Sequence, residues 1–220
     1  MGKPVRGWHA IPAVLAVLIT CSVAGAAVAA PPEGKGPGGG VGCPTGSAQV
    51  VLDPGHGGSD PGAVANGIVE AKLNLDIAQR VASLLAFTKA LTREDNATTL
   101  GNSERGDIAN ACGALVYVSI HFNASGDPAI NFTQMFWGKK RKDLEFASWM
   151  SSYMQLGIDN HGAGQFANGA LRSASMPATL IECAVITNPD EAALLADPAS
   201  GRRDQIAAAI AAGINDWLGA

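Results

Sequence analysis

The chain has 220 residues, of which 47% are hydrophobic and 15% charged, with a formal net charge of −4. This much apolar material excludes wholesale disorder, because such a composition can bury a substantial core. The length fits one domain of ordinary size with an appendage. The sequence pI of about 5.5 argues against a nucleic-acid partner, since nucleic-acid binders carry a strongly basic face.

The first thirty residues have the pattern of an export signal. Lys3 and Arg6 are positive, residues 10–30 carry no charge, and Ala27-Val28-Ala29 has the small residues of a cleavage site. We therefore expect a signal peptide over residues 1–30 and export to the periplasm, the cell wall or the medium, with no stable membrane span after cleavage. An uncleaved anchor is the alternative, because 21 uncharged residues could cross a bilayer, and a lipoprotein signal at Cys21 is a third.

Residues 31–46 read PPEGKGPGGGVGCPTG, a composition typical of a flexible tether. One folded domain is therefore expected over residues 47–220, and the protein is expected to be a monomer.

Three cysteines follow the predicted signal peptide. In an exported protein this number predicts one disulfide and one free thiol. Cys183 directly follows Glu182 on a predicted strand, so its side chain points to the opposite face, into the core. We therefore expect Cys43 to pair with Cys112.

The rest of the chain alternates predicted strands and helices. In chain order the patterns predict a strand over 49–52, a turn at 66–67, a helix over 70–85, a strand over 89–92, a helix over 103–112, strands over 115–120 and 132–137, a helix over 142–156, a strand over 178–182, a helix starting at 188–191 and a helix over 203–217. Asn188 is the expected cap of the penultimate helix, with Pro189 as its first residue. This alternation predicts a single α/β domain with a mostly parallel or mixed central sheet and helices on both faces.

Chemically versatile side chains fall at the ends of these elements. His56 follows the first predicted strand, His121 and Glu182 end two later strands, and Glu70 begins a helix. Because the carboxyl ends of such strands share one rim of the sheet, we expect these four side chains to converge. Two imidazoles and one carboxylate are a common catalytic zinc set that leaves a position for water, and the second carboxylate could act as general base.

Other interpretations of these residues stay open at this point. Glu70 could simply stabilise the helix dipole, and His161 is a rival ligand that would give a three-histidine site. Asp53 either orients His56 through its second ring nitrogen or only forms a turn. The sequence has no HExxH motif, so the site is not of the helical metalloprotease type.

The motifs resemble a known family. They read VVLDPGHGGSDPGA, NGIVEAKLNLDIAQRVASLL, LTREDN, ERGDIANACGALVYVSIHFNAS and MPATLIECAVITNPDEAALL. Together, over about residues 48–218, they resemble the zinc-dependent N-acetylmuramoyl-L-alanine amidases of the amidase_3 type. The resemblance implies one zinc ion per chain, held by His56, Glu70 and His121, with Glu182 as the catalytic glutamate, and it gives His161 no ligand role.

The implied reaction is hydrolysis of the amide between N-acetylmuramic acid and the L-alanine of the stem peptide. The implied partners are peptidoglycan or muropeptide fragments. Two alternatives stay open: a catalytically weak module that binds muropeptides, and a zinc carboxypeptidase that cuts within the stem.

Overall fold

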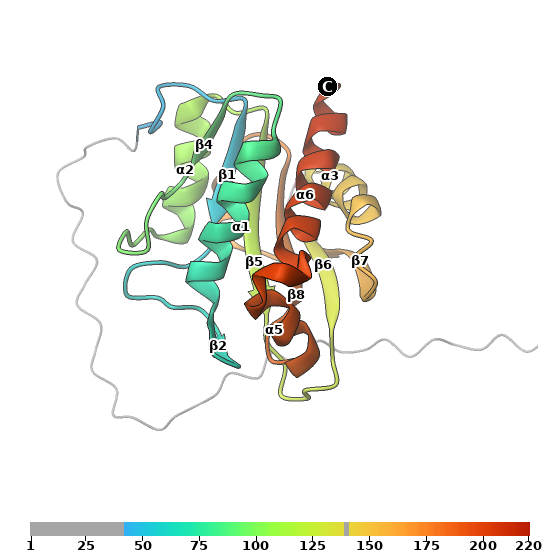
Figure 1. Ribbon diagram of the computed structural model, residues 1–220. Helices are drawn as coiled ribbons and strands as arrows, with labels where there is room; N and C mark the ends of the chain where they lie inside the picture. Colours follow the sequence, from blue (N-terminus) through green and yellow to red (C-terminus); the bar gives the residue numbers. More distant parts are fainter. Residues whose placement is uncertain (1–41, 139–140) are drawn as a thin grey trace, which may run out of the picture. The chain divides into compact units, whose positions relative to one another are not determined.

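The computed structural model describes residues 42–138 and 141–220 (Figure 1). Its elements are β1 (Val50–Pro54), β2 (Val64–Ala65), β3 (Ile68–Val69), α1 (Glu70–Leu84), β4 (Lys89–Leu91), α2 (Asn102–Cys112), β5 (Val116–Asn123), β6 (Phe132–Trp137), α3 (Arg141–Tyr153), β7 (Asp159–Gln165), α4 (Gly169–Ser173), β8 (Ala178–Val185), α5 (Pro189–Ala196), η1 (Pro198–Ser200) and α6 (Arg202–Leu218). The predicted signal peptide and residues 31–41 of the predicted tether lie outside the described residues. None of the helices within the described ranges has the length and apolar composition needed to cross a membrane.

Within the described residues, six strands form the central sheet, in the order β4-β1-β5-β8-β6-β7. Strands β4, β1, β5 and β8 run parallel, β6 runs antiparallel to β8, and β7 is parallel to β6. The mixed α/β sheet expected from the sequence is therefore confirmed. The carboxyl ends of β1, β5 and β8 share one edge, with the amino end of β6 beside them.

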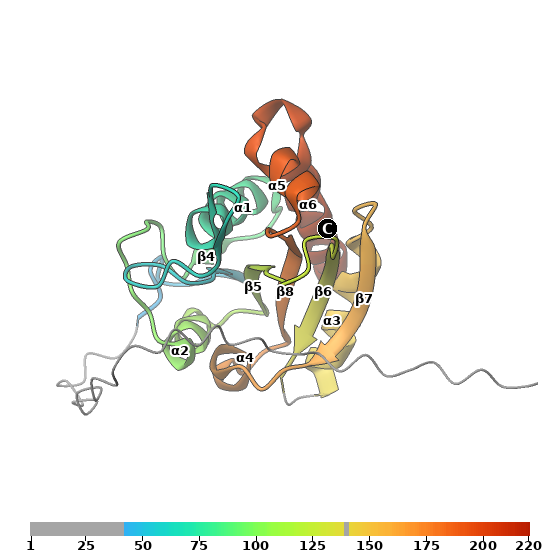
Figure 2. The same cartoon turned by 90° about the horizontal axis from the view of Figure 1, so that it is seen from below.

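Helices cover both faces of this sheet. Figure 2 shows α1, α5 and α6 on one side and α2 and α4 on the other. Along β1, Val50 and Leu52 belong to the larger apolar cluster, and Val51 belongs to the smaller one, which includes residues of α2 and α4. Successive residues of a strand point to opposite faces, so a strand covered on both sides must be a continuous apolar run. This is why β1 and β5 were recognisable from sequence.

Helix α3 lies on the α6 side of the sheet. Its Phe146 packs against Trp217 of α6 with ring centroids 5.1 Å apart, and Trp149 donates a hydrogen bond to the Gly213 carbonyl at 2.9 Å. A Cβ at Gly213 would stand 2.8 Å from the sulfur of Met150. A larger residue at Gly213 would have to displace the end of the Met150 side chain, so glycine suits this contact between α3 and α6.

Two local predictions are confirmed by the structure. Asn66 and Gly67 join β2 to β3 with φ angles of 50° and 78°, the left-handed pair that a two-residue Asn-Gly hairpin requires. Asn188 caps α5 by accepting a hydrogen bond from the Glu191 backbone N–H at 2.9 Å.

The sequence did not predict strand β7, helix α4, the two-residue strands β2 and β3, or the three-residue helix η1. Strand β7 reads DNHGAGQ and lacks both apolar alternation and β-branched residues, because it is an edge strand whose side chains are only partly covered. Helix α4 has five residues, which is too few to show a helical period.

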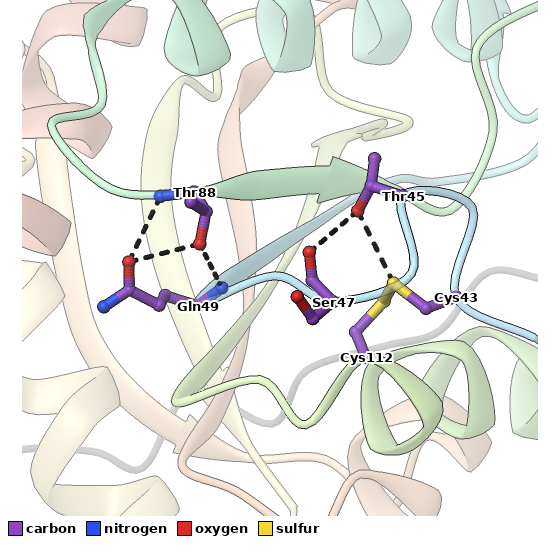
Figure 3. The surroundings of a disulfide bond; sticks show 6 residues. All are labelled: Cys43, Thr45, Ser47, Gln49, Thr88 and Cys112. Carbon is purple, nitrogen blue, oxygen red and sulfur yellow. Dashed lines mark hydrogen bonds between the residues drawn. A yellow bond between two sulfur atoms is a disulfide. The ribbon is translucent and has the colours of Figure 1, made fainter.

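The expected disulfide is confirmed. Cys43 is bonded to Cys112 at the end of α2, and Cys183 is a free, buried thiol. Figure 3 shows that the disulfide ties the segment before β1 to α2. In the same segment the Thr45 hydroxyl donates to the Ser47 carbonyl at 3.0 Å. The last residues of the predicted tether are therefore attached to the folded domain.

Candidate active site

Glu70 is the centre of the candidate site. It begins α1 directly after the β2–β3 hairpin, and its side chain is buried. Its Oε2 accepts a hydrogen bond from the Ala63 backbone N–H at 2.8 Å. Its Oε1 lies 3.0 Å from Nε2 of His56 and 3.1 Å from Nδ1 of His121. One carboxylate oxygen thus faces both imidazoles while the backbone holds the other.

The loop that carries His56 is held by two buried guanidinium groups. His56 has a φ of 61°, which is uncommon for a residue other than glycine. Arg93 donates to the carbonyls of Pro54 and Gly55, at 2.9 Å each. Arg105 donates to the His56 carbonyl at 2.8 Å. Three consecutive carbonyls are fixed in this way, which stabilises the unusual backbone conformation at His56.

Asp60, and not Asp53, contacts the second ring nitrogen of His56. Asp60 Oδ2 lies 2.7 Å from Nδ1 of His56. The interpretation that Asp53 orients His56 is therefore wrong. Asp53 lies two residues after Val51 on β1, so its side chain points to the same face of the sheet, towards α2. There its Oδ1 forms an ion pair with Arg105 at 2.8 Å. In the sequence, the only indication of this role is that Asp60 follows His56 by four residues within a glycine-rich loop.

His121 reaches the site because a glycine makes room for it. His121 lies on β5, in register with Glu182 of β8. A Cβ at Gly55 would stand 2.2 Å from both Cε1 and Nε2 of the His121 ring. Gly55 is therefore needed for the space it leaves, and its φ lies outside the left-handed region.

These donors could hold a metal ion. One ligand atom from each of His56, Glu70 and His121 lies within 4.8 Å of the other two. Ligand atoms at 2.0–2.1 Å from a tetrahedral ion stand about 3.3 Å apart, close to the 3.0 and 3.1 Å separations from the Glu70 oxygen. Two imidazole nitrogens and one carboxylate oxygen are a donor set that suits divalent transition metals and zinc.

The charges of this cluster support one another. Burial disfavours the charged form of His56, but hydrogen bonds and charge from Glu70 and Asp60 outweigh it and raise the pKa of His56 to about 9. Burial likewise opposes ionisation of Glu70, but the two imidazoles outweigh it and hold the Glu70 pKa well below its ordinary value. Glu70 is therefore an anion at neutral pH, and a metal ion binding here would release a proton from His56.

Glu182 is the fourth polar side chain of the site. It is half-buried, and within the described residues its buried Oε2 has no hydrogen-bond partner. Burial raises the pKa of Glu182 to about 7, opposed by the charge of His121 and reinforced by that of Glu70. A buried carboxyl oxygen without a partner is rare in native structures, and a pKa near 7 is suited to proton transfer at neutral pH.

Residues 50–216 match the sequence profile of the family Amidase_3, described as N-acetylmuramoyl-L-alanine amidase. The chain belongs to this amidase family. The N-acetylmuramoyl-L-alanine amidase LytC of Bacillus subtilis (strain 168) is 32% identical over 155 residues, which cover 66% of this chain and 31% of LytC. An endolysin of Bacillus phage SPP1 is 37% identical over 161 residues, which cover 68% of this chain and 59% of the endolysin.

The fold of this amidase-family chain is also that of solved amidase structures. The catalytic domain of CwlV, an N-acetylmuramoyl-L-alanine amidase from Bacillus (Paenibacillus) polymyxa var. colistinus, matches with a TM-score of 0.72 and 34% identity. The match covers 77% of this chain and 97% of that domain. In contrast, the chain spans less than two thirds of the length of either LytC or the phage endolysin.

The structure brings together the four side chains that the sequence singled out. His56, Glu70 and His121 form one cluster, and Glu182 lies on the strand next to His121. His161 is outside this cluster, because it lies on β7 and its ring stacks on that of Phe132 in β6. The rival three-histidine interpretation is therefore wrong.

Proposed function

We propose that this chain is a peptidoglycan hydrolase that cleaves the amide between N-acetylmuramic acid and the L-alanine of the stem peptide. The main support comes from Glu182. Its buried and unpartnered carboxyl oxygen lies beside a histidine–glutamate–histidine cluster in a member of the amidase family. A module that only bound muropeptides would have no need of such a carboxyl group.

We further propose that the cluster holds one zinc ion, with His56, Glu70 and His121 as its ligands. The support is the donor set itself, since nitrogen and carboxylate ligands of this kind form catalytic zinc sites with an open position. A zinc ion bound there supplies a Lewis acid that polarises the substrate carbonyl and makes water a nucleophile near neutral pH. Asp60 would keep the His56 ring in the orientation that presents Nε2 to the ion.

Glu182 is the proposed general base. Its unpartnered oxygen can take a proton from the attacking water, and the same proton can then pass to the nitrogen of L-alanine as the carbon–nitrogen bond breaks. A pKa of about 7 is matched to both steps, because the group can accept and return a proton at neutral pH. The products are the lactyl carboxylate of the sugar and the free amine of the stem peptide.

We propose that residues 1–30 direct export and are removed, that residues 31–46 form a tether, and that residues 47–220 are the catalytic domain, working in the periplasm, the cell wall or the medium. A monomer suffices, because all four proposed site residues come from one chain. Peptidoglycan or its muropeptide fragments are the proposed substrates.

Mass spectrometry of the products from a defined muramoyl-peptide tests the function. The expected products are the intact sugar acid and the free L-alanyl peptide, and a chelator should abolish their formation. Cuts within the stem peptide would instead indicate a peptidase, and a bound but uncleaved substrate would indicate a binding module. Either result would overturn the proposal.

Two glutamate variants separate the proposed roles. Glu182→Gln keeps the size of the side chain but removes the proton acceptor, so turnover should fall by about 10²–10⁴-fold with zinc content unchanged. Glu70→Gln should instead lose zinc, which metal analysis after dialysis would detect. Exposed Glu94 offers the matched control, since Glu94→Gln should alter neither property.

A further inference from the structure

Strand β7 contains a bulge beside the candidate site. Between Asn160 and Ala163 its register advances by three residues while β6 advances by two. Gly162 lies within the bulge and has the left-handed φ of 70° that favours glycine. Asn160 fixes the bulge to α3, because its Oδ1 accepts from the Gly162 N–H at 2.9 Å and its amide donates to the Ser151 carbonyl at 2.8 Å. Bulges of this kind re-aim a side chain.

The side chain that this bulge re-aims is His161. Its imidazole stacks on Phe132 of β6, with ring centroids 4.0 Å apart and an angle of 12° between the planes. His161 is exposed, and its ring nitrogens make no hydrogen bond within the described residues. The histidine is therefore held in place by stacking while its polar atoms stay available.

Gln134 lies between this aromatic pair and Glu182 on the sheet. It lies in register opposite Glu182 across the β6–β8 ladder, so the two side chains share a face of the sheet. Phe132 and Gln134 are partly exposed on this face, whereas Thr133 between them is fully buried on the other. Within the described part of the chain the Gln134 amide makes no hydrogen bond.

The spacing of these side chains suits a ligand that extends away from Glu182. Diagonal neighbours on paired strands stand about 7–8 Å apart, which is the expected step from Glu182 to Phe132. Two residues of an extended peptide span about 7 Å. A substrate whose scissile bond lies beside Glu182, and which runs along this face of the sheet towards β7, would therefore lie over Gln134 and the His161–Phe132 pair.

Resting on the proposed amidase function, we propose that His161, Phe132 and Gln134 form a platform that binds an amide-bearing part of the muramoyl-peptide next to the scissile bond. The amide of Gln134 both donates and accepts, which matches the N–H and C=O of a substrate amide. The His161 ring adds a flat surface and a ring nitrogen. Two substrate groups have this chemistry, the next amide of the stem peptide and the acetamido group of the sugar.

Steady-state kinetics of Gln134→Ala and His161→Ala on a muramoyl-peptide tests the platform. We expect KM to rise about tenfold in each variant, with kcat within about threefold of the unmodified protein and zinc content unchanged. Gln155→Ala is the matched control, because Gln155 is an exposed glutamine just after α3, on the other side of the sheet. His161→Phe keeps the stack and removes the ring nitrogens, so it separates their contributions. Unchanged KM values in both alanine variants would overturn the proposal.

Inhibition by the two halves of the substrate then identifies the bound group. If only free L-alanyl peptide inhibits the variants more weakly than it inhibits the unmodified protein, the platform binds the stem peptide. If only N-acetylmuramic acid does so, the platform binds the sugar. Calorimetric binding of the muramoyl-peptide to zinc-loaded Glu182→Gln protein, with and without the platform substitutions, tests the platform with turnover suppressed. If the unmodified protein binds this ligand without cleaving it, the proposed function fails while a loss of affinity in the variants still supports the platform. Equal affinity in all variants rejects it.

Discussion

Replacing Gly55 by alanine should displace His121 from the proposed metal site, because the substitution adds one carbon atom beside its ring. The new Cβ would stand 2.2 Å from two atoms of the His121 ring. An ordinary contact begins at 3.4 Å, so the ring or the loop must move by about 1.2 Å, the difference between these distances. The ring is the part that can move, because hydrogen bonds from Arg93 and Asn74 hold the Gly55 carbonyl.

A displacement of this size carries a predictable cost. It would separate Nδ1 of His121 from the Glu70 oxygen that now lies 3.1 Å away. Misplacement of a reacting or coordinating group by about 1 Å costs on the order of 100-fold in rate, and we expect metal affinity to fall by a similar factor. The free energy of unfolding should fall by only about 1–3 kcal/mol, as for other overpacked sites.

Chelator competition measures the metal affinity of Gly55→Ala, and thermal unfolding shows that the variant still folds. The control is Gly101→Ala, because a Cβ at Gly101 meets no atom within 4 Å. If the zinc affinity and the turnover of the Gly55 variant stay within about threefold of those of the unmodified protein, the close approach of Gly55 to His121 does not govern the geometry of the site.

Asp60→Ala should weaken zinc binding about 10–100-fold in chelator competition, whereas the exposed Asp127→Ala should not, and equal affinities would contradict the role of Asp60. Reduction of the Cys43–Cys112 disulfide, which spans 69 residues, should lower the free energy of unfolding in urea by up to about 4 kcal/mol, and identical urea midpoints with and without reductant would contradict this. Asp53→Ala should lower the same free energy by about 3–5 kcal/mol, because it leaves a buried guanidinium group unpaired. Burial opposes ionisation of Asp53, but its ion pair and hydroxyl partners hold its pKa below the ordinary value, so this contribution is complete above about pH 4 and is lost as the pH falls through the folded pKa. The acid limb of the stability profile should therefore be shallower in the variant, and an equally steep limb would count against the assignment.

The sequence by itself determined the α/β class and most of the element order. The continuous apolar runs of β1 and β5, the Asn-Gly hairpin and the Asn188 cap are local signals, and each depends on only a few neighbouring residues. The motifs around His56 and His121 were also sufficient to indicate the family, because the same short strings carry both the site residues and the turns that position them.

Tertiary structure alone decided which groups meet across the sheet. Asp53 and Asp60 are both acidic neighbours of His56 in the sequence. The pleat of β1 directs Asp53 towards α2, and the left-handed turn at His56 brings Asp60 to its ring nitrogen. Likewise, nothing local places His161 on Phe132, because β7 is an edge strand that exists only through pairing with β6 and owes its bulge to that pairing. A sequence pattern encodes the face a residue occupies, but the partner on that face comes from a distant segment through register and packing.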